Sequence, residues 1–224
     1  MLMAVFCLGA SLIGINAQEK DWANLQRYAQ QNAELPKPDK NEKRVVFMGN
    51  SITEGWVNTH PDFFKSNGYI GRGIGGQTSY QFLVRFREDV INLSPALVVI
   101  NAATNDIAEN TGAYHEDRTF GNIVSMVELA KANHIKVILT TTLPAAAFGW
   151  NPAIKDAPQK IQSLNARIEA YAKANKIPFV NYYKAMVDEN QALNPQYTKD
   201  GVHPTGEGYD IMEPLIKSAI EKAL

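Results

Sequence analysis

Five short apolar runs recur along the chain, separated by longer segments of mixed polarity. They cover residues 44–48, 69–74, 96–101, 136–141 and 177–181, and the run at 69–74 is the weakest. Their apolar residues stand at successive positions and not at every second position. That pattern predicts strands that are covered on both faces.

The segments between these runs carry apolar residues at helical spacing. The segment 157–175 places Ile161, Leu164 and Ile168 on one stripe. The same spacing predicts helices over 80–91, 120–133 and 209–223, and a shorter one over 21–31. Strands that alternate with helices favour βαβ units. We therefore expect one α/β domain with three layers, α/β/α, around a central parallel sheet.

The N-terminal segment indicates export. Residues 1–17 contain no charged residue and end in Ile15-Asn16-Ala17, which resembles a small-residue cleavage site. The run is too short to cross a membrane, which takes about 20 residues. The basic start of a signal peptide is missing, so an upstream start codon or an N-terminal core helix are the alternatives. We expect a signal peptide over 1–17, a helix and loop over 18–43, and a secreted or periplasmic protein without stable membrane insertion.

Composition and the remaining motifs exclude several classes of function. The chain has 22 Lys and Arg against 23 Asp and Glu, a poor balance for a nucleic-acid binder. The single cysteine, Cys7, excludes disulfide scaffolds and thiolate metal sites. Residues 71–76 fit Gly-x-Gly-x-x-Gly, but no acidic residue ends the next strand, at Asn101, to bind a ribose. We expect neither a metal nor another cofactor.

Chemically useful residues follow the predicted strands, where ligands of such sheets bind. Ser51, Gly76 and Asn105 each come after a run, and Asp200 and His203 stand near the C-terminus. The Asp-x-x-His spacing lets the carboxylate orient the imidazole and leaves Nε2 as a base, which a serine nucleophile needs. A glycine N–H and an asparagine amide can stabilise an oxyanion. The remaining histidines are expected in loops or at a helix end: His60, His115 and His134.

These residues carry a specific resemblance to the SGNH hydrolases, also called the GDSL esterase/lipase family. Four family blocks resemble residues 49–53, 73–78, 104–106 and 200–204, and the resemblance runs from about Arg44 to the C-terminus. It implies a flavodoxin-like SGNH hydrolase domain over 44–224 and metal-free ester hydrolysis. By the same resemblance, the nucleophile is Ser51, the acid and base are Asp200 and His203, and the oxyanion donors are Gly76 and Asn105.

Two positions depart from the family pattern. Asn50 replaces the aspartate before the serine, and Ala103 replaces the glycine that opens the third block. Both departures keep a second hypothesis open, a binding module of the same fold with a disabled site. A third hypothesis is a thioesterase or lysophospholipase that acts on longer acyl chains.

Aromatic residues near the predicted site point to a substrate class. Phe148 and Trp150 lie in the loop after the run at 136–141, and Trp56 lies five residues after Ser51. Flat aromatic faces pack well against sugars, and the chain also resembles carbohydrate acetylesterases of the family. We expect these three side chains to bind a small or glycan ester, from which the enzyme removes O-acetyl groups. Alternatively, Phe148 and Trp150 only pack the loop onto the sheet.

Overall fold

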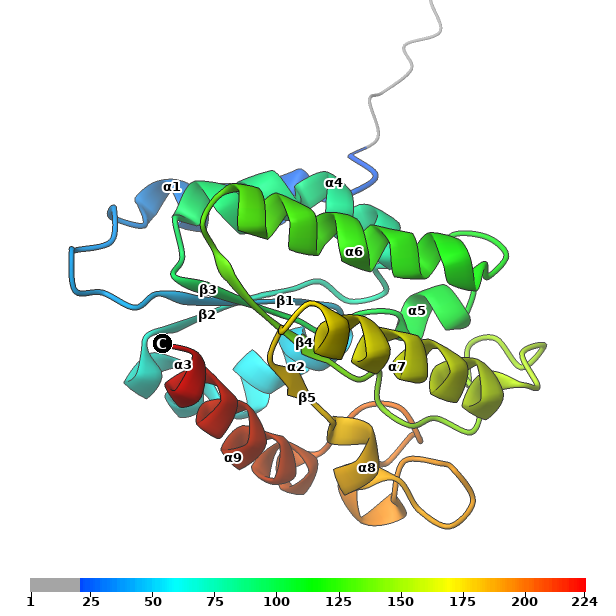
Figure 1. The fold of residues 1–224 in the computed structure, drawn as a ribbon. Coiled ribbons are helices and arrows are strands. Elements are labelled where there is room, and N and C mark those ends of the chain that lie inside the picture. The colour runs from blue at the N-terminus through cyan, green and yellow to red at the C-terminus, as the bar shows by residue number, and fades with distance from the viewer. Residues whose placement is uncertain (1–20) are drawn as a thin grey trace, which may run out of the picture.

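A computed structural model describes residues 21–224 as three layers around one parallel sheet (Figure 1). The strands follow the order β2-β1-β3-β4-β5. They are β1 (Val45–Gly49), β2 (Tyr69–Gly73), β3 (Leu97–Ile100), β4 (Lys136–Thr140) and β5 (Phe179–Val180). This is the order of flavodoxin-like folds, so the predicted α/β/α architecture is confirmed.

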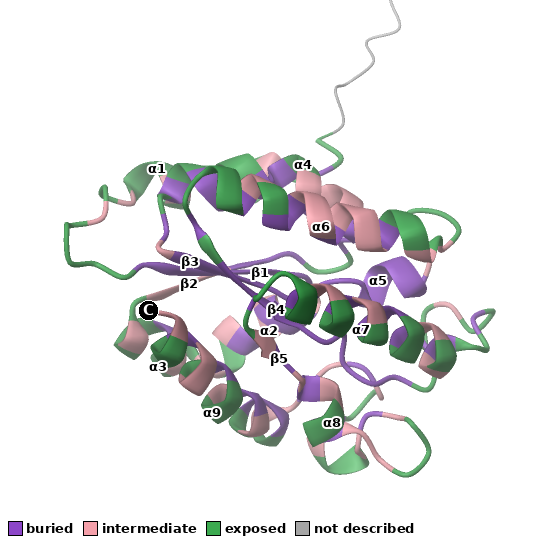
Figure 2. Cartoon of the chain, viewed as in Figure 1, coloured by how far each residue is buried: buried purple, intermediate pink, exposed green. Residues whose placement is uncertain are grey.

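The two faces of the sheet are covered by different sets of helices (Figure 1). On one face lie α4 (Ser79–Asp89), α6 (Glu116–Ala132) and α7 (Ala157–Ala174), and on the other lie α2 (Ser51–Thr59), α3 (Pro61–Asn67), α8 (Tyr182–Met186) and α9 (Gly206–Ala223). Successive residues of β1 alternate between the two cores, with Val46 and Met48 in one and Val45 and Phe47 in the other. The strands β1 and β3 and most of β4 are therefore buried on both faces, as Figure 2 shows in purple, whereas β2 and β5 are only partly buried.

The two edge strands explain the weaker sequence signals. β2 contains Gly71 and Gly73 and lies at one edge of the sheet. At the other edge, β5 is shorter than the run predicted over 177–181. There the Ile177 N–H donates to Ala172 O at the end of α7, and Pro178 has no N–H, so neither residue donates to the β4 ladder.

Four short helices were not predicted: α2, α3, α8 and α5 (Thr104–Ile107). The four longer helices were found as α4, α6, α7 and α9. In α2, Thr53, Gly55 and Thr59 are weak helix formers, so intrinsic propensity does not favour the helix. Burial of Ile52 and Trp56 in the core decides its structure instead.

The helix predicted over 21–31 is replaced by two shorter elements. A 3-10 helix spans Leu25–Arg27 and α1 spans Ala29–Glu34, while the loop that follows agrees with the prediction. This segment packs against the domain, because Tyr28 Oη donates to Gly73 O and Asn32 Nδ2 donates to Asp89 Oδ1 at 2.8 Å. The predicted signal peptide lies outside the described residues.

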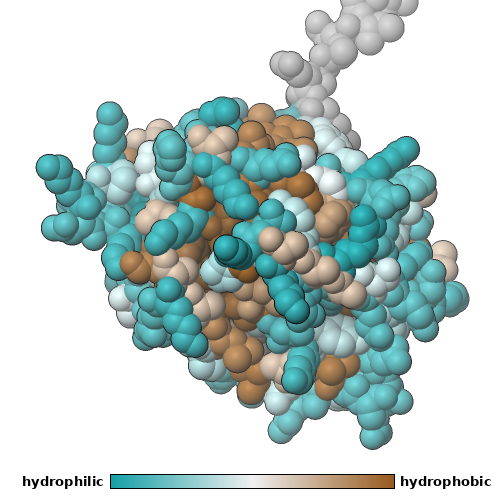
Figure 3. Space-filling view, in the orientation of Figure 1, coloured by the Kyte–Doolittle hydropathy of each residue, from teal (hydrophilic) through white to brown (hydrophobic). Residues whose placement is uncertain are grey.

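Two further 3-10 helices, Ile91–Leu93 and Pro195–Tyr197, complete the elements of the described chain. Polar side chains cover most of the face drawn in Figure 3, and apolar side chains show between them near its middle. Among the helices of residues 21–224, none is both long and apolar enough to cross a membrane.

Candidate active site

Ser51 is the first residue of α2, directly beyond the carboxyl end of β1. The strand enters the helix through Gly49, where a Cβ atom would lie 2.0 Å from Thr53 Oγ1, so only glycine fits. Asn50 caps the helix, because its Oδ1 accepts the Ile52 N–H at 3.0 Å. This tight turn leaves the Ser51 hydroxyl partly exposed, with Oγ 2.9 Å from His203 Nε2.

His203 and Asp200 lie in the loop before α9 and pair as the spacing predicts. His203 Nδ1 is 2.7 Å from Asp200 Oδ2, and Asp200 Oδ1 accepts the N–H groups of Val202 and His203 at 2.9 and 2.8 Å. Burial acts to raise the pKa of the Asp200 carboxyl, but these hydrogen bonds outweigh it and lower that pKa to about 2. The carboxylate therefore stays charged beside the imidazole at neutral pH.

The loop after β2 brings Gly76 to the same edge of the sheet. An ideal Cβ on the neighbouring Gly75 would lie 3.8 Å from Ser51 Cβ, so this loop borders the serine. Ile74, Gly75 and Gln77 donate their N–H groups at 3.1, 2.9 and 3.4 Å to Gly49 O, Glu54 Oε2 and Ile74 O. Within the described chain, the Gly76 N–H has no acceptor, which leaves it available to a ligand.

Asn105 lies at the start of α5, beyond β3, and its Nδ2 donates to Gln77 O at 2.9 Å. One N–H of this amide is thereby fixed and the other remains. The neighbouring Asp106 anchors α5, because it accepts bonds from Ser79 N at 2.9 Å and Thr119 Oγ1 at 3.2 Å. Burial raises the pKa of Asp106 despite these bonds. The position of Asn105 is therefore fixed by its own hydrogen bond to Gln77 O and by the bonds of the neighbouring Asp106.

The sequence reasoning missed one donor, the backbone N–H of Ser51 itself. As the first amide of α2 it has no partner inside the helix, and in the described part of the chain it has none elsewhere. A free amide at a helix N-terminus carries partial positive charge. Recognising that a helix begins at Ser51 would have revealed it.

The structure separates the three predicted aromatic residues. Trp150 is 46% exposed, and its ring centroid lies 6.1 Å from that of His203. Its Nε1 donates to Asn110 Oδ1 at 2.8 Å, and Asn110 Nδ2 donates to Gly76 O at 3.0 Å. Asn110 therefore links Trp150 to Gly76 in the loop after β2.

Trp56 and Phe148 do not face the site, which corrects the expectation that both contact substrate. Trp56 is 2% exposed and stacks against Phe63 and Tyr209, each with ring centroids 5.5 Å away. Phe148 is fully buried, 5.3 Å from the Trp150 ring. Both rings fill cores beside the sheet, so Phe148 supports Trp150 and Trp56 supports α2.

The two departures from the family pattern, Asn50 and Ala103, both have a structural consequence. Asn50 is fully buried, and in residues 21–224 its Nδ2 finds no hydrogen-bond partner. Ala103 adopts φ +86°, a left-handed conformation that costs free energy for any residue with a Cβ. Neither change removes a hydrogen bond of the Ser51, His203 and Asp200 chain.

One group away from Ser51 could hold a metal ion. His60, Asp210 and Glu213 place one ligand atom each within 4.8 Å of one another. The His60 Nδ1 to Glu213 Oε1 distance is 2.6 Å, and Trp56 Nε1 donates to the same oxygen at 3.1 Å. These bonds give the group a structural role without an ion, because they connect Trp56 of α2 and the following His60 to Glu213 of α9.

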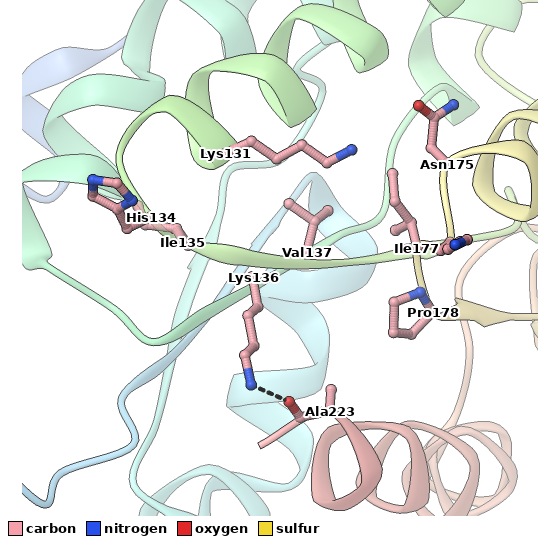
Figure 4. A pocket seen from close by; sticks show the side chains of 10 residues that line it. Lys131, His134, Ile135, Lys136, Val137, Asn175, Ile177, Pro178 and Ala223 are labelled. Carbon is pink, nitrogen blue, oxygen red and sulfur yellow. Dashed lines mark hydrogen bonds between the residues drawn. The ribbon is translucent and has the colours of Figure 1, made fainter.

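A separate cavity of about 410 Å³ lies at the other end of the strands, where β4 begins (Figure 4). Its lining includes Lys131, His134 and Lys136, and Lys136 Nζ donates to Ala223 O at 2.6 Å, the dashed line in Figure 4. The chemistry-bearing loops instead meet at the carboxyl ends of β1, β2 and β3. That edge is where ligands of parallel sheets bind.

Solved structures of high sequence identity share this architecture. A Bacteroides fragilis NCTC 9343 protein assigned as an acylhydrolase is 90% identical, with a TM-score of 0.91 over 91% of this chain and 99% of that chain. A GDSL-like lipase of Bacteroides thetaiotaomicron VPI-5482 is 83% identical, with a TM-score of 0.89 over 90% and 99% of the two chains. An acetyl xylan esterase shares the fold at 22% identity, with a TM-score of 0.63 over 79% and 98%.

A curated sequence relative is an uncharacterised lipoprotein of Bacillus subtilis strain 168. It is 32% identical over 117 residues, which are 45% of this chain and 48% of the relative. The matched region thus spans about half the length of that protein.

The family comparison agrees with the resemblance in the four sequence blocks. The GDSL-like Lipase/Acylhydrolase family matches residues 47–211, a span that begins in β1 and ends in α9 and so includes Ser51 and His203. Because this match covers most of the chain, the protein belongs to the GDSL-like lipase/acylhydrolase family, the SGNH hydrolases.

Proposed function

We propose that the protein is a serine esterase in which Ser51 is the nucleophile, His203 the base and Asp200 the residue that orients His203. The observation that carries the proposal is the continuous chain from Ser51 Oγ to His203 Nε2, 2.9 Å, and from His203 Nδ1 to Asp200 Oδ2, 2.7 Å. Family membership supports an acylhydrolase at the coarser level. The chain of hydrogen bonds is what a serine needs to become nucleophilic at neutral pH.

Acylation begins when Ser51 Oγ attacks the ester carbonyl and its proton moves to His203 Nε2. The carbonyl oxygen becomes an oxyanion, and the N–H groups of Ser51 and Gly76 and the amide of Asn105 are positioned to stabilise it. Collapse breaks the bond to the alcohol, which leaves with the proton from His203 Nε2. Water then repeats the sequence on the acyl-enzyme, giving the acid and free Ser51.

The finer proposal is that the acyl group is acetyl and the alcohol is a carbohydrate. The exposed Trp150 ring beside His203 offers a flat surface to a sugar ring on the leaving-group side. An acetyl xylan esterase with the same fold supports acetyl chemistry by analogy only. A lysophospholipase or thioesterase would need an apolar channel for a long chain, and a binding module would not hydrolyse any ester.

A chain-length series tests both levels of the proposal. Nitrophenyl acetate should be hydrolysed faster than the octanoate, acetate should be released from acetylated xylan, and Ser51→Ala should abolish both activities. Faster octanoate hydrolysis without glycan deacetylation would favour a lipase or thioesterase. Complete inactivity of the folded wild type would favour the binding module.

Trp150 has its own test. Trp150→Ala should lower kcat/KM for acetylated xylo-oligosaccharide about 10-fold, the loss expected for one aromatic contact of about 1.4 kcal/mol. Activity on ethyl acetate, whose alcohol has no ring to stack, should change less than about twofold. Leu215→Ala is the control, because Leu215 is an exposed apolar residue of α9, 38% exposed, without a hydrogen bond to the proposed catalytic residues. Equal losses on both substrates would contradict sugar stacking.

We also propose that the protein is exported. The charge-free residues 1–17 and the Bacillus subtilis relative, a lipoprotein, support this. N-terminal sequencing of the mature protein from its native cells should begin at Gln18 or within a few residues. An intact Met1 on a cytoplasmic protein would contradict the proposal.

A further inference from the structure

The loop 73–77, which carries the free Gly76 N–H, is held by partners from several parts of the chain. Gly73 O accepts the Tyr28 hydroxyl, and Gly76 O accepts Asn110 Nδ2 at 3.0 Å. The Gln77 side chain donates to Ala23 O at 2.7 Å and accepts from Arg85 Nε at 2.6 Å. Two of these contacts come from the segment 21–34, outside the region that matches the family.

Glu54 contacts Gly75, the residue that precedes Gly76. It lies one helical turn after Ser51 on α2, and its Oε2 accepts the Gly75 N–H at 2.9 Å. The peptide group that joins Gly75 to Gly76 follows directly, so the orientation of Gly75 sets the direction of the Gly76 N–H. An ideal Cβ on Gly75 would lie 3.1 Å from Glu54 Oε2, closer than most Cβ contacts, so this approach favours glycine.

Arg27 occupies the other oxygen of the same carboxylate. Arg27 Nη2 lies 2.9 Å from Glu54 Oε1, and this hydrogen bond raises the pKa of the guanidinium. A carboxylate near a developing oxyanion would oppose the negative charge there. Arg27 offsets this effect by placing a permanent positive charge on the far side of Glu54, and it also fixes the carboxylate rotamer.

We propose that Glu54 is a positioning residue that aims the Gly76 N–H at the oxyanion, and that Arg27 of the N-terminal segment holds and neutralises Glu54. The inference rests on the proposed esterase function. It assigns the segment 21–34 a role in the reaction, although no atom of that segment touches the reacting groups. A simple structural tie between the segment and α2 would change stability and leave the transition state untouched.

Kinetics of Glu54 variants separate these two roles. Removing one oxyanion donor costs about 10²–10³ in kcat, and a misdirected donor should cost part of that. Glu54→Ala should therefore lower kcat for nitrophenyl acetate about 10- to 100-fold, with KM changed less than about threefold. Glu54→Gln keeps an oxygen for the Gly75 N–H and should recover most of kcat. Arg27→Ala should give an intermediate loss.

Binding of phenylboronic acid gives a second readout. The acid forms a tetrahedral adduct on a serine and places an oxygen where the oxyanion would lie. Because such analogues report transition-state stabilisation, its Ki should rise in Glu54→Ala by about the factor by which kcat/KM falls. A purely structural tie would leave the Ki of the folded variant unchanged.

Glu116→Ala is the matched control. It also removes a carboxylate that pairs with an arginine at 2.9 Å, Arg167, but this pair joins α6 to α7 and has no contact with loop 73–77. Its kcat should stay within about twofold of wild type. Full kcat and unchanged Ki in folded Glu54→Ala, with wild type active and Ser51→Ala inactive, would overturn this inference alone. A wild type that hydrolyses no ester would overturn the proposed function and this inference with it.

Discussion

The candidate site has two halves that are held in place in different ways. Asp200 and His203 belong to a loop whose hydrogen bonds are local: the Gly201 N–H donates to Thr198 Oγ1 at 3.0 Å, and His203 pairs with Asp200. The loop 73–77 is instead held mostly by residues 21 to 54 positions away, such as Glu54 and Ala23, although Arg85, which binds Gln77, is only eight positions away. The hydrogen bonds within the first half are thus local in sequence, whereas those that hold the second half come mostly from distant parts of the chain.

The two halves also differ in how far their side chains are exposed to solvent. The side chains of Asp200 and His203 are 54% and 38% exposed, whereas Arg85, which anchors Gln77, is fully buried. The local hydrogen bonds of Asp200 and His203 therefore hold these two side chains in place although both are partly exposed. The loop 73–77 instead rests on buried residues such as Arg85, although Gly75 and Gly76 are themselves exposed. Changes in the first half should therefore affect the rate more than the stability, and changes at buried residues of the second half should mainly affect the stability.

The largest expected effect falls on the exposed half. His203→Ala should lower kcat/KM about 10³-fold or more, because loss of a triad member typically costs that much. Its urea midpoint should remain near that of wild type. His134→Asn is the control, since His134 has φ +59° at the other end of the strands and asparagine tolerates that conformation. More than a tenth of the wild-type rate in His203→Ala would refute the base assignment.

Arg85→Ala tests the buried half. Arg85 lies 2.8 Å from both Asp89 Oδ2 and Gly49 O, and the variant leaves the buried Asp89 without its cation. Unfolding free energy should fall by about 3–5 kcal/mol, measured by urea denaturation. Removing the more exposed Arg167, whose side chain is 36% exposed, should cost less than about 1 kcal/mol. Equal costs for the two arginines would remove the distinction between the halves.

The pH dependence sharpens the assignment of the acid and the base. The pKa of Asp200 is lowered to about 2 in the folded protein, from the 3.8 of a free aspartate. Its contribution to stability is therefore present above about pH 4 and is lost as the pH falls towards 2. Because Asp200 is already charged above about pH 4, a fall in kcat/KM between pH 8 and 5 would not come from Asp200. A histidine base accepts the Ser51 proton only when its imidazole is neutral. A flat profile between pH 5 and 8 would contradict a histidine base.

The smallest effect concerns Ala103. Its φ of +86° is strained for alanine and accessible to glycine, so Ala103→Gly should stabilise the protein by about 0.5–1 kcal/mol. The greater freedom of glycine in the unfolded chain reduces the gain. The change in thermal midpoint measures it. A destabilised Ala103→Gly variant would show that the methyl group contributes packing that outweighs the strain.

The sequence predicted the sheet because its strands are buried on both faces and are therefore apolar at successive positions. It also predicted the pairing of Asp200 with His203, since an Asp-x-x-His spacing acts locally. Burial of Trp56 escaped prediction, and burial of Phe148 was only one of two alternatives, because the sequence alone does not distinguish an aromatic residue in a core from one in a binding site. The long-range contacts of Glu54 and Arg85 escaped it as well, because nothing in local spacing indicates which distant loop a charged side chain reaches.

The parallel sheet also aligns the dipoles of the helices that connect its strands. The helices that cross back between its strands point the partial positive charge of their N-termini, including that of α2 at Ser51, towards the edge where a carbonyl oxygen would gain negative charge. Their negative ends gather at the opposite edge, beside Lys131, Lys136 and Lys176. Lys136 binds the last turn of α9 directly, through Ala223 O. The positive ends of the helix dipoles thus face the site of the proposed reaction, and the lysines offset the negative ends at the other end of the strands.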